Sequence, residues 1–186
     1  VEAEIEVLRQ MGVEFRMNTE VGKDITIREL RMQGYEAFYL AIGAQGGRRL
    51  GVEGEDASGV LSGVEFLRKM NLHEALKLEG RTVVVGGGNV AIDVARTAVR
   101  AGSSEVGLYC LESEKEMPAQ EEEQQEAKEE GISLNHGWGP KRILAEDGKV
   151  KGIEFKRCTR VFDEEHRFHP QYDEADTVIV ECDNIL

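Results

Sequence analysis

The apolar and polar positions near the start of the chain predict short, separate elements. Apolar residues recur at helical spacing over residues 1–11, which predicts a helix, and a strand is predicted at 13–17. Thr26 and Glu29 stand three residues apart as in a capping box, so a second helix is expected to begin there. Residues 37–42 form a continuous apolar run, which is typical of a strand in a sheet that is covered on both faces.

The middle of the chain has the pattern of a β-α-β unit. A glycine-rich stretch at 44–63 is predicted to be a loop between two units. Residues 82–85 are β-branched and predict a short buried strand, which is followed at once by three glycines. A helix with many small residues is predicted at 89–101, and residues 106–111 supply the next strand. A unit of about 30 residues is the expected size for two parallel strands joined by a helix.

The last third of the chain predicts one more helix and further strands. Residues 119–130 are rich in Glu and Gln and are typical of a helix with a solvated face. The strand-like stretches at 132–134, 143–144 and 150–155, with turn residues at 146–148, predict a late antiparallel hairpin. The fold class is therefore expected to be α/β, with a Rossmann-like nucleotide-binding domain that has a parallel sheet and a late β-hairpin.

The glycines after the first predicted β-α-β strand fit a dinucleotide-binding fingerprint. Gly86, Gly88 and Ala91 have the G-x-G-x-x-A spacing, with a strand before them and a helix after them. The first glycine permits the tight turn, the second lets a diphosphate approach the backbone, and the alanine lets the helix pack close to the sheet. Backbone amides at the helix start, with the helix dipole behind them, favour an anion. The predicted cofactor-binding residues here are Gly86, Gly87, Gly88, Asn89, Val90 and Ala91. A glycine-rich turn that binds nothing is the alternative.

Glu112, at the end of the second predicted strand, bears on which dinucleotide is bound. A carboxylate there accepts hydrogen bonds from an adenosine ribose, and it repels a 2′-phosphate by about 4 kcal/mol per unit charge at ~4 Å and an effective dielectric constant of about 20. The nearest cation in the sequence is Lys115. The sequence therefore predicts NAD(H) in preference to NADP(H), unless Glu112 is only a solvated surface residue.

The composition of the chain bears on which partners it can have. The 186 residues include 36 acidic and 23 basic ones, which gives a formal net charge of −13. Such a surface repels nucleic acid and anionic lipid, and no apolar run approaches the ~20 residues of a membrane helix. Neither nucleic acid nor a membrane is therefore an expected partner.

The spacing of the cysteines and histidines differs from that of a metal site or a disulfide framework. The three cysteines are scattered and odd in number, and the histidines lack helical metal-ligand spacing. We therefore expect no metal site and a reducing, cytoplasmic location. The residues concerned are Cys110, Cys158, Cys182, His73, His136, His166 and His169.

Several motifs together resemble the small (beta) subunit of glutamate synthase and its relatives. The matching segments are GGGNVAIDVARTA at 86–98, MPAQEEE at 117–123, NTEVGKDITIREL at 18–30, YLAIGA at 39–44 and VEGEDASGV at 52–60. The resemblance implies an FAD domain that is interrupted by an NAD(P)H-binding domain, both Rossmann-like. It also implies FAD and iron–sulfur clusters in the complete protein or its partner, and a redox partner subunit or domain.

The resemblance also implies a division of the chain and roles for individual residues. Residues 1–60 would be a partial FAD-domain segment, 61–160 the NAD(P)H-binding domain, and 161–186 the return to the FAD domain. Chain ends of this kind lead us to expect a piece of a longer protein. Ala41, Ile42 and Gly43 match the family's turn near the flavin, and Asn89, Asp93 and Arg96 match the helix that helps to place the nicotinamide cofactor.

One departure from the family pattern concerns the 2′-phosphate. Members that use NADPH commonly carry two arginines where this sequence has Cys110 and Leu111, directly before Glu112.

The implied reaction is hydride transfer from NAD(P)H to flavin and electron transfer onward to iron–sulfur centres, with the isolated chain inactive. Two rival interpretations are a binding-only Rossmann domain that senses the NADH/NAD ratio and a methyltransferase-like fold that binds S-adenosylmethionine.

Overall fold

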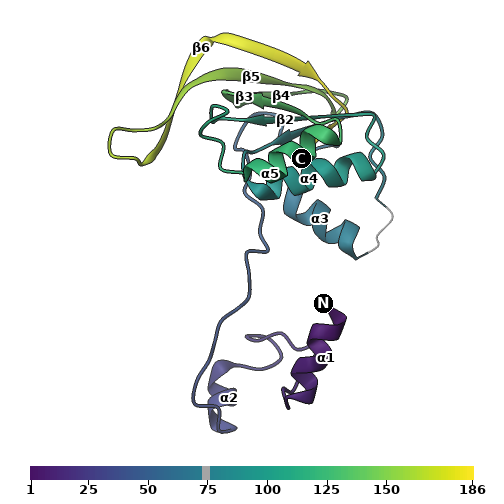
Figure 1. Cartoon of the computed structure of the whole chain (residues 1–186), viewed down its shortest axis with the longest axis vertical. Helices are drawn as coiled ribbons and strands as arrows, with labels where there is room; N and C mark the ends of the chain where they lie inside the picture. Colours follow the sequence, from purple (N-terminus) through teal and green to yellow (C-terminus); the bar gives the residue numbers. More distant parts are fainter. Residues whose placement is uncertain (73–75) are drawn as a thin grey trace. The chain divides into compact units, whose positions relative to one another are not determined.

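A computed structural model describes residues 1–72 and 76–186, so His73 lies outside the described residues. The chain forms two compact units, residues 1–43 and residues 44–186 (Figure 1).

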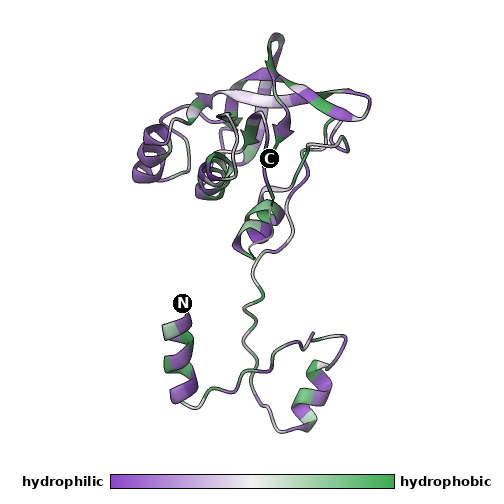
Figure 2. Ribbon diagram, turned by 90° about the vertical axis from the view of Figure 1, so that its right-hand side faces the viewer, coloured by the Kyte–Doolittle hydropathy of each residue, from purple (hydrophilic) through white to green (hydrophobic). Residues whose placement is uncertain are grey.

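The first unit contains two short helices and no strand ladder. Helix α1 spans Glu2–Gln10 and α2 spans Ile27–Met32. Thr26 Oγ1 accepts a hydrogen bond from Glu29 N while the Glu29 carboxylate accepts one from Thr26 N, so the predicted capping box is confirmed. No side chain of this unit is buried, and Figure 2 shows apolar and polar residues side by side along α1.

The strands predicted at 13–17 and 37–42 are wrong. Both stretches lack regular ladder partners, and Tyr39 in the second is 94% exposed. A strand is stable only when its backbone N–H and C=O groups pair with a neighbouring strand, and residues 1–43 provide no such neighbour for either stretch.

The second unit is built on a four-stranded parallel sheet with the order β3-β2-β1-β7. The strands are β1 (Arg81–Val85), β2 (Glu105–Cys110), β3 (Ser133–His136) and β7 (Asn184–Ile185). The predicted β-α-β unit is confirmed as β1, α4 and β2, and β1 pairs in parallel with β2 over its whole length. Strand β7 pairs on the other side of β1, about 100 residues later in the chain.

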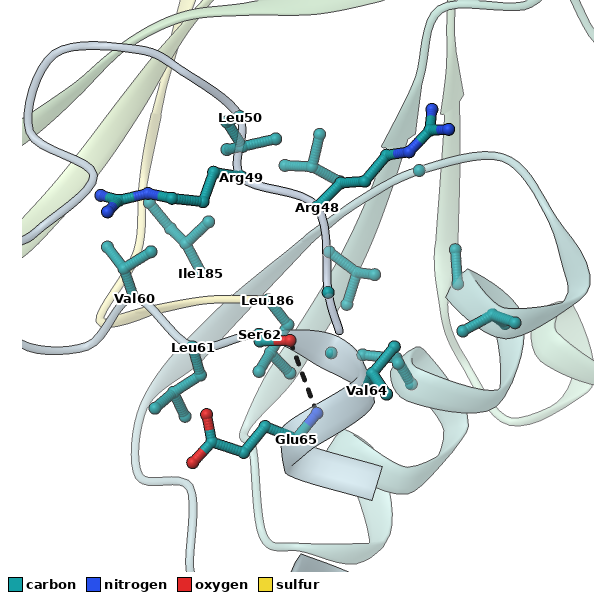
Figure 3. A pocket seen from close by; sticks show the side chains of 18 of the residues that line it. Arg48, Arg49, Leu50, Val60, Leu61, Ser62, Val64, Glu65, Ile185 and Leu186 are labelled. Atoms are coloured by element: carbon teal, nitrogen blue, oxygen red, sulfur yellow. Dashed lines mark hydrogen bonds between the residues drawn. The ribbon is translucent and has the colours of Figure 1, made fainter. Parts of the chain in front are cut away.

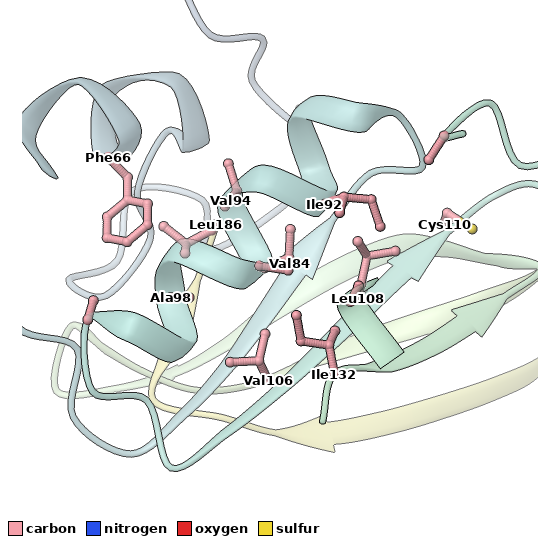
Figure 4. Close-up of a cluster of buried hydrophobic side chains, with 14 of the residues drawn as sticks. Phe66, Val84, Ile92, Val94, Ala98, Val106, Leu108, Cys110, Ile132 and Leu186 are labelled. Atoms are coloured by element: carbon pink, nitrogen blue, oxygen red, sulfur yellow. The ribbon is translucent and has the colours of Figure 1, made fainter. Parts of the chain in front are cut away.

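Helices cover one face of this sheet, as Figures 1 and 4 show. They are α3 (Gly63–Asn71), α4 (Asn89–Arg100) and α5 (Glu121–Glu129). Phe66 of α3, Ile92 of α4 and Leu108 of β2 are almost fully buried in the cluster between the helices and the sheet. This burial stabilises the unit by roughly 1.5–3 kcal/mol for each large apolar side chain.

An antiparallel sheet covers the opposite face of the parallel sheet. It consists of β4 (Trp138–Glu146), β5 (Lys149–Phe162) and β6 (Phe168–Glu181), in that order. The β4–β5 hairpin turns at Asp147 and Gly148, which both have positive φ, so the predicted late hairpin is confirmed. The ring of Phe155 stacks on that of Tyr109 of the parallel sheet, with centroids 4.5 Å apart.

One part of the hairpin prediction is wrong. Ser133 and Leu134 of the stretch at 132–134 belong to β3, which pairs in parallel with β2 and not with β4 or β5. A three-residue stretch such as Ile-Ser-Leu carries no information about which sheet it joins, so sequence alone grouped it with the next strands along the chain.

Candidate functional site

The glycine turn lies where the order of the parallel sheet reverses. From β1 the chain proceeds through α4 to β2 and then through α5 to β3 on one side, whereas β7 lies on the other side of β1. In open α/β sheets, ligands bind in the crevice at the carboxyl ends of the strands at such a reversal. The turn that connects β1 to α4 is located there.

The backbone of the turn explains why its residues are small. Gly86 has φ +147°, and a Cβ on it would lie 3.2 Å from the Cβ of Ala91, so a larger residue at either position would force α4 away from β1. Gly88 is the N-cap of α4 with φ −91°. A Cβ on Gly88 would meet no atom within 4 Å, which means that open space lies in front of its Cα.

Four consecutive backbone N–H groups of the turn lack a hydrogen-bond acceptor. Within the described chain, the amides of Gly87, Gly88, Asn89 and Val90 donate to no protein atom, whereas the amides of Gly86 and Ala91 on either side are bonded to Tyr109 O and Gly88 O. These free amides and the start of the 12-residue helix α4 together favour an anion in front of the turn.

A pocket of about 780 Å³ opens beside the turn (Figure 3). This volume is within the usual range for a small-molecule site. Apolar residues such as Val60, Val90 and Leu186 form much of its wall. The lining residues are 47–50, 55–57, 60–65, 84–86, 88–91, 94, 185 and 186.

Two neighbouring arginines of the pocket differ in their partners. Arg49 pairs with Asp56 and Glu55, and Glu55 also accepts hydrogen bonds from Leu50 N and Gly51 N. Arg48 is exposed and forms no ion pair with any described residue. Figure 3 shows their side chains pointing in opposite directions. Arg48 therefore adds an uncompensated positive charge to the pocket.

Glu112 lies against the other side of the turn. Its Oε2 atom is 2.6 Å from where a Cβ of Gly87 would be, and Cys110 Cβ would be 3.1 Å from the same point. Because Gly87 has no side chain, this carboxylate can lie next to the turn. The backbone oxygen of Glu112 accepts a hydrogen bond from Gly137 N at 2.9 Å, which fixes the chain at this position.

Asp93 and Arg96 do not line the pocket. Asp93 is exposed on α4. The guanidinium of Arg96 pairs with Glu123, Glu126 and Glu130, and the hydrogen bond to Glu130 is the largest contribution that raises its pKa. In this structure Arg96 links α4 to α5, and a role for either residue toward a cofactor remains a prediction.

Ala41, Ile42 and Gly43 are the last residues of the first unit. Ile42 is exposed, and Gly43 has φ +67°, a conformation that favours glycine. The predicted role of these residues near a flavin remains a prediction.

Cys110 does not occupy a surface position at which a phosphate could bind. Its side chain is almost fully buried in the core, and burial is the main cause that raises the pKa of its thiol to about 12. Cys158 and Cys182 are also buried free thiols. In the described part of the chain, no three side chains of the His, Cys, Asp and Glu types gather as a metal site would require.

Sequence reasoning missed two parts of the site. Arg48 lies in a stretch assigned only as a loop, and nothing in its local pattern indicates that it faces the pocket. Ala119 and Gln120 are bonded to the glycine turn, and the only signal for them was that the MPAQEEE motif belongs to the resemblance. No helix among the described residues has the length and apolarity to cross a bilayer.

Comparison with protein families gives one match over most of the chain. The profile of the pyridine nucleotide-disulphide oxidoreductase family matches residues 23–182.

Two curated relatives have related names. The NADP(+)-dependent formate dehydrogenase subunit beta of Moorella thermoacetica is 42% identical over 161 residues, which cover 85% of this chain and 22% of that protein. The glutamate synthase [NADPH] small chain of Escherichia coli is 36% identical over 164 residues, which cover 82% of this chain and 34% of that protein. The chain thus spans between 22% and 34% of the length of these relatives.

Among solved structures, FprA of Mycobacterium tuberculosis in complex with NADPH has a similar fold. The TM-score is 0.73 at 19% sequence identity, over 90% of this chain and 52% of that one. The predicted α/β, Rossmann-like fold class is confirmed by this likeness and by the parallel sheet.

Proposed function

This chain belongs to the pyridine nucleotide-disulphide oxidoreductase family, and from that premise we propose that it is the NAD(P)H-binding part of an FAD-dependent oxidoreductase. The likeness to the glutamate synthase small subunit that the motifs indicated is confirmed by the match to the Escherichia coli protein of that name. The observation that carries the proposal is the set of four free amides at the point where the sheet order reverses, beside an open pocket.

The residues of the turn fit the diphosphate of a dinucleotide. The free amides of Gly87 to Val90 supply donors, and the absence of a side chain on Gly88 leaves the space that a diphosphate needs. Arg48 supplies a positive charge that no described carboxylate neutralises. The apolar lining of the pocket excludes water from the part of the ligand that it contacts.

A bound nicotinamide and an FAD in the complete protein would supply the redox chemistry, with hydride leaving C4 of the nicotinamide for N5 of the flavin. This chain's own task is to bind and orient, because the cofactors carry the reaction and no protein nucleophile or proton relay is needed. Residues 1–43 bury no side chain, so by themselves they do not enclose a flavin. We therefore expect the isolated chain to bind dinucleotide and to be inactive.

The division of the chain is part of the proposal. Residues 1–60 would belong to the FAD domain, with Ala41, Ile42 and Gly43 near the flavin, 61–160 would bind NAD(P)H, and 161–186 would begin the return segment. The motifs quoted above support this division.

Partners and location are likewise proposed. The words "subunit" and "small chain" in the relatives' names support a redox partner, and iron–sulfur centres that receive the electrons rest on the family resemblance. The three free thiols are compatible with a reducing cytoplasm.

The preference for NADH over NADPH rests on this chain's residues alone. Both curated relatives carry NADP(+) or NADPH in their names, so the comparisons do not support it. The support is the Glu112 carboxylate beside Gly87 and the absence of arginine at positions 110 and 111. A tenfold tighter binding of NADPH than of NADH by the unchanged chain would overturn this preference.

Titration calorimetry of the full chain tests the proposed site. We expect NADH to bind, S-adenosylmethionine not to bind, and Gly88→Ala to weaken NADH binding about tenfold or more. The added methyl meets no protein atom within 4 Å and φ is −91°, so the fold itself should tolerate it. Gly46→Ala is the matched control, because a Cβ on Gly46 also has open space but lies outside the pocket lining. Equal NADH affinity of the two variants, or no binding of either dinucleotide by the unchanged chain, would contradict the proposal.

A further inference from the structure

The segment from Glu112 to Gln120, which connects β2 to α5, is bonded to the glycine turn at two points. Ala119 N donates a hydrogen bond to Gly87 O at 3.0 Å, and Gln120 N donates one to Asn89 Oδ1 at 2.9 Å. Both acceptors belong to the part of the chain that has the four free amides. We call residues 112–120 the crossing segment.

The crossing segment is held firmly at both ends. At its start, Glu112 O accepts from Gly137 N. Toward its end, Met117 and Ala119 are buried in the core below α4, and the buried Gln124 donates from Nε2 to Ala119 O at 2.8 Å. The Gln120 N–H group is therefore a fixed donor and not the end of a mobile loop.

This donor determines how the carboxamide of Asn89 is turned. A backbone N–H group only donates, so the Asn89 atom that faces it must be the oxygen. The Nδ2 group, which carries two donors, is then the free end of the carboxamide, and it forms no hydrogen bond with any described residue. Asn89 lines the pocket and is the first residue of α4. Without the Gln120 bond, the carboxamide could present its oxygen, which an anion repels.

We propose that the backbone N–H of Gln120 is a positioning group for dinucleotide binding: by holding Asn89 Oδ1, it leaves Nδ2 as an additional donor toward the diphosphate. The inference rests on the proposed function. It goes beyond that function by stating that the crossing segment, which also contains Glu112, affects the affinity for the dinucleotide through Asn89.

Gln120 offers a substitution that removes this donor. Its φ is −61°, which is the value that proline adopts, and its side chain makes no cap hydrogen bond. Gln120→Pro therefore fits the backbone angle and deletes the N–H group. Its ring Cδ takes the place of the amide hydrogen that faced Asn89 Oδ1, so the carboxamide must turn away, whereas the matched control Gln120→Ala keeps the N–H group. One hydrogen bond to a charged ligand changes affinity by about tenfold.

Calorimetric titration of the full chain with NADH is the test. We expect Gln120→Ala to bind as the unchanged chain does, Gln120→Pro to bind about five- to tenfold more weakly, and Asn89→Ala to lose about tenfold. The double variant Asn89→Ala with Gln120→Pro should bind no more weakly than Asn89→Ala alone, because both changes remove the same contact. A merely structural role would lower the thermal midpoint and would give losses that add.

Two results overturn the inference alone: equal NADH affinity of Gln120→Pro and Gln120→Ala, or additive losses in the double variant. Failure of the unchanged chain to bind any dinucleotide overturns the proposed function as well. If Gln120→Pro does not fold, Asn89→Asp decides, since it keeps the acceptor for Gln120 but lacks the donors. It should bind NADH at least as weakly as Asn89→Ala, and binding equal to that of the unchanged chain overturns the inference.

Discussion

The two units of this chain respond differently to similar sequence signals. In residues 1–43 the capping box correctly predicts the start of α2, but no side chain is buried. In residues 44–186 the helices and strands bury a shared core on both faces of a parallel sheet. The difference teaches that a cap is sufficient to begin a helix, whereas a strand requires a partner.

Two apolar runs make the same point. Residues 82–85 lie within β1 because β2 and β7 pair with its two edges. Residues 37–42 are equally apolar but lack such partners, and Leu40 is 75% exposed. Strand propensity describes how well a side chain fits a pleated surface, and that surface must exist before the propensity has any effect.

The largest expected effect comes from a leucine-to-alanine substitution, which we compare between the two units. Leu108→Ala removes a fully buried side chain of β2 and should lower the free energy of unfolding of the second unit by about 2–5 kcal/mol. Leu40→Ala should leave that quantity within about 0.5 kcal/mol of its original value. Urea denaturation followed by the fluorescence of Trp138 measures both. Equal losses would show that Leu40 is buried in solution.

A smaller effect compares the N-caps of the two units. Thr26→Ala removes a capping-box bond from a six-residue helix without buried residues, which costs about 1 kcal/mol, so NMR chemical shifts should report loss of α2. Ser62→Ala removes the cap of α3, but Phe66 anchors that helix in the core, so its shifts should remain helical. Retention of α2 in Thr26→Ala would mean that packing, and not the cap, holds it.

The smallest expected effect concerns acid. Burial raises the pKa of Glu130, but hydrogen bonds and charges from Arg96 and Arg100 lower it by more, so its pKa lies below the usual 4.5. The stability that Glu130 contributes is therefore present above pH 4.5 and is lost as the pH falls through the lowered pKa. Thermal midpoints from pH 7 to 3 should fall less steeply for Glu130→Gln than for the unchanged chain.

Its counterpart in the first unit is Glu29, whose pKa is lowered mainly by the hydrogen bond from Thr26 N. Protonation of Glu29 should reduce the helicity of α2 and should not contribute to the fall in the midpoint of the second unit. Glu129→Gln is the control, since Glu129 forms no ion pair among the described residues. A slope for Glu129→Gln as shallow as that for Glu130→Gln would contradict the assignment to Glu130.

Sequence was sufficient for those parts of the fold and site whose causes are local. The β1–α4–β2 unit and the turn from Gly86 to Ala91 follow from strand, glycine and helix signals that lie within about 30 residues. The crossing segment, the place of Arg48 in the pocket lining and the place of β7 depend on contacts between distant residues, which no local pattern encodes. Arg96 pairs with Glu126 and Glu130 in this structure, and its role toward a cofactor, which the resemblance implies, remains a prediction.

Strand β7 has a consequence for the order in which the molecule is made. Ile185 and Leu186 form one wall of the pocket, and Leu186 O accepts from Val85 N at 2.8 Å. A ribosome releases the glycine turn about 100 residues before it releases that wall. During synthesis the turn therefore lacks this wall of its pocket, and the site is complete only when these late residues leave the exit tunnel.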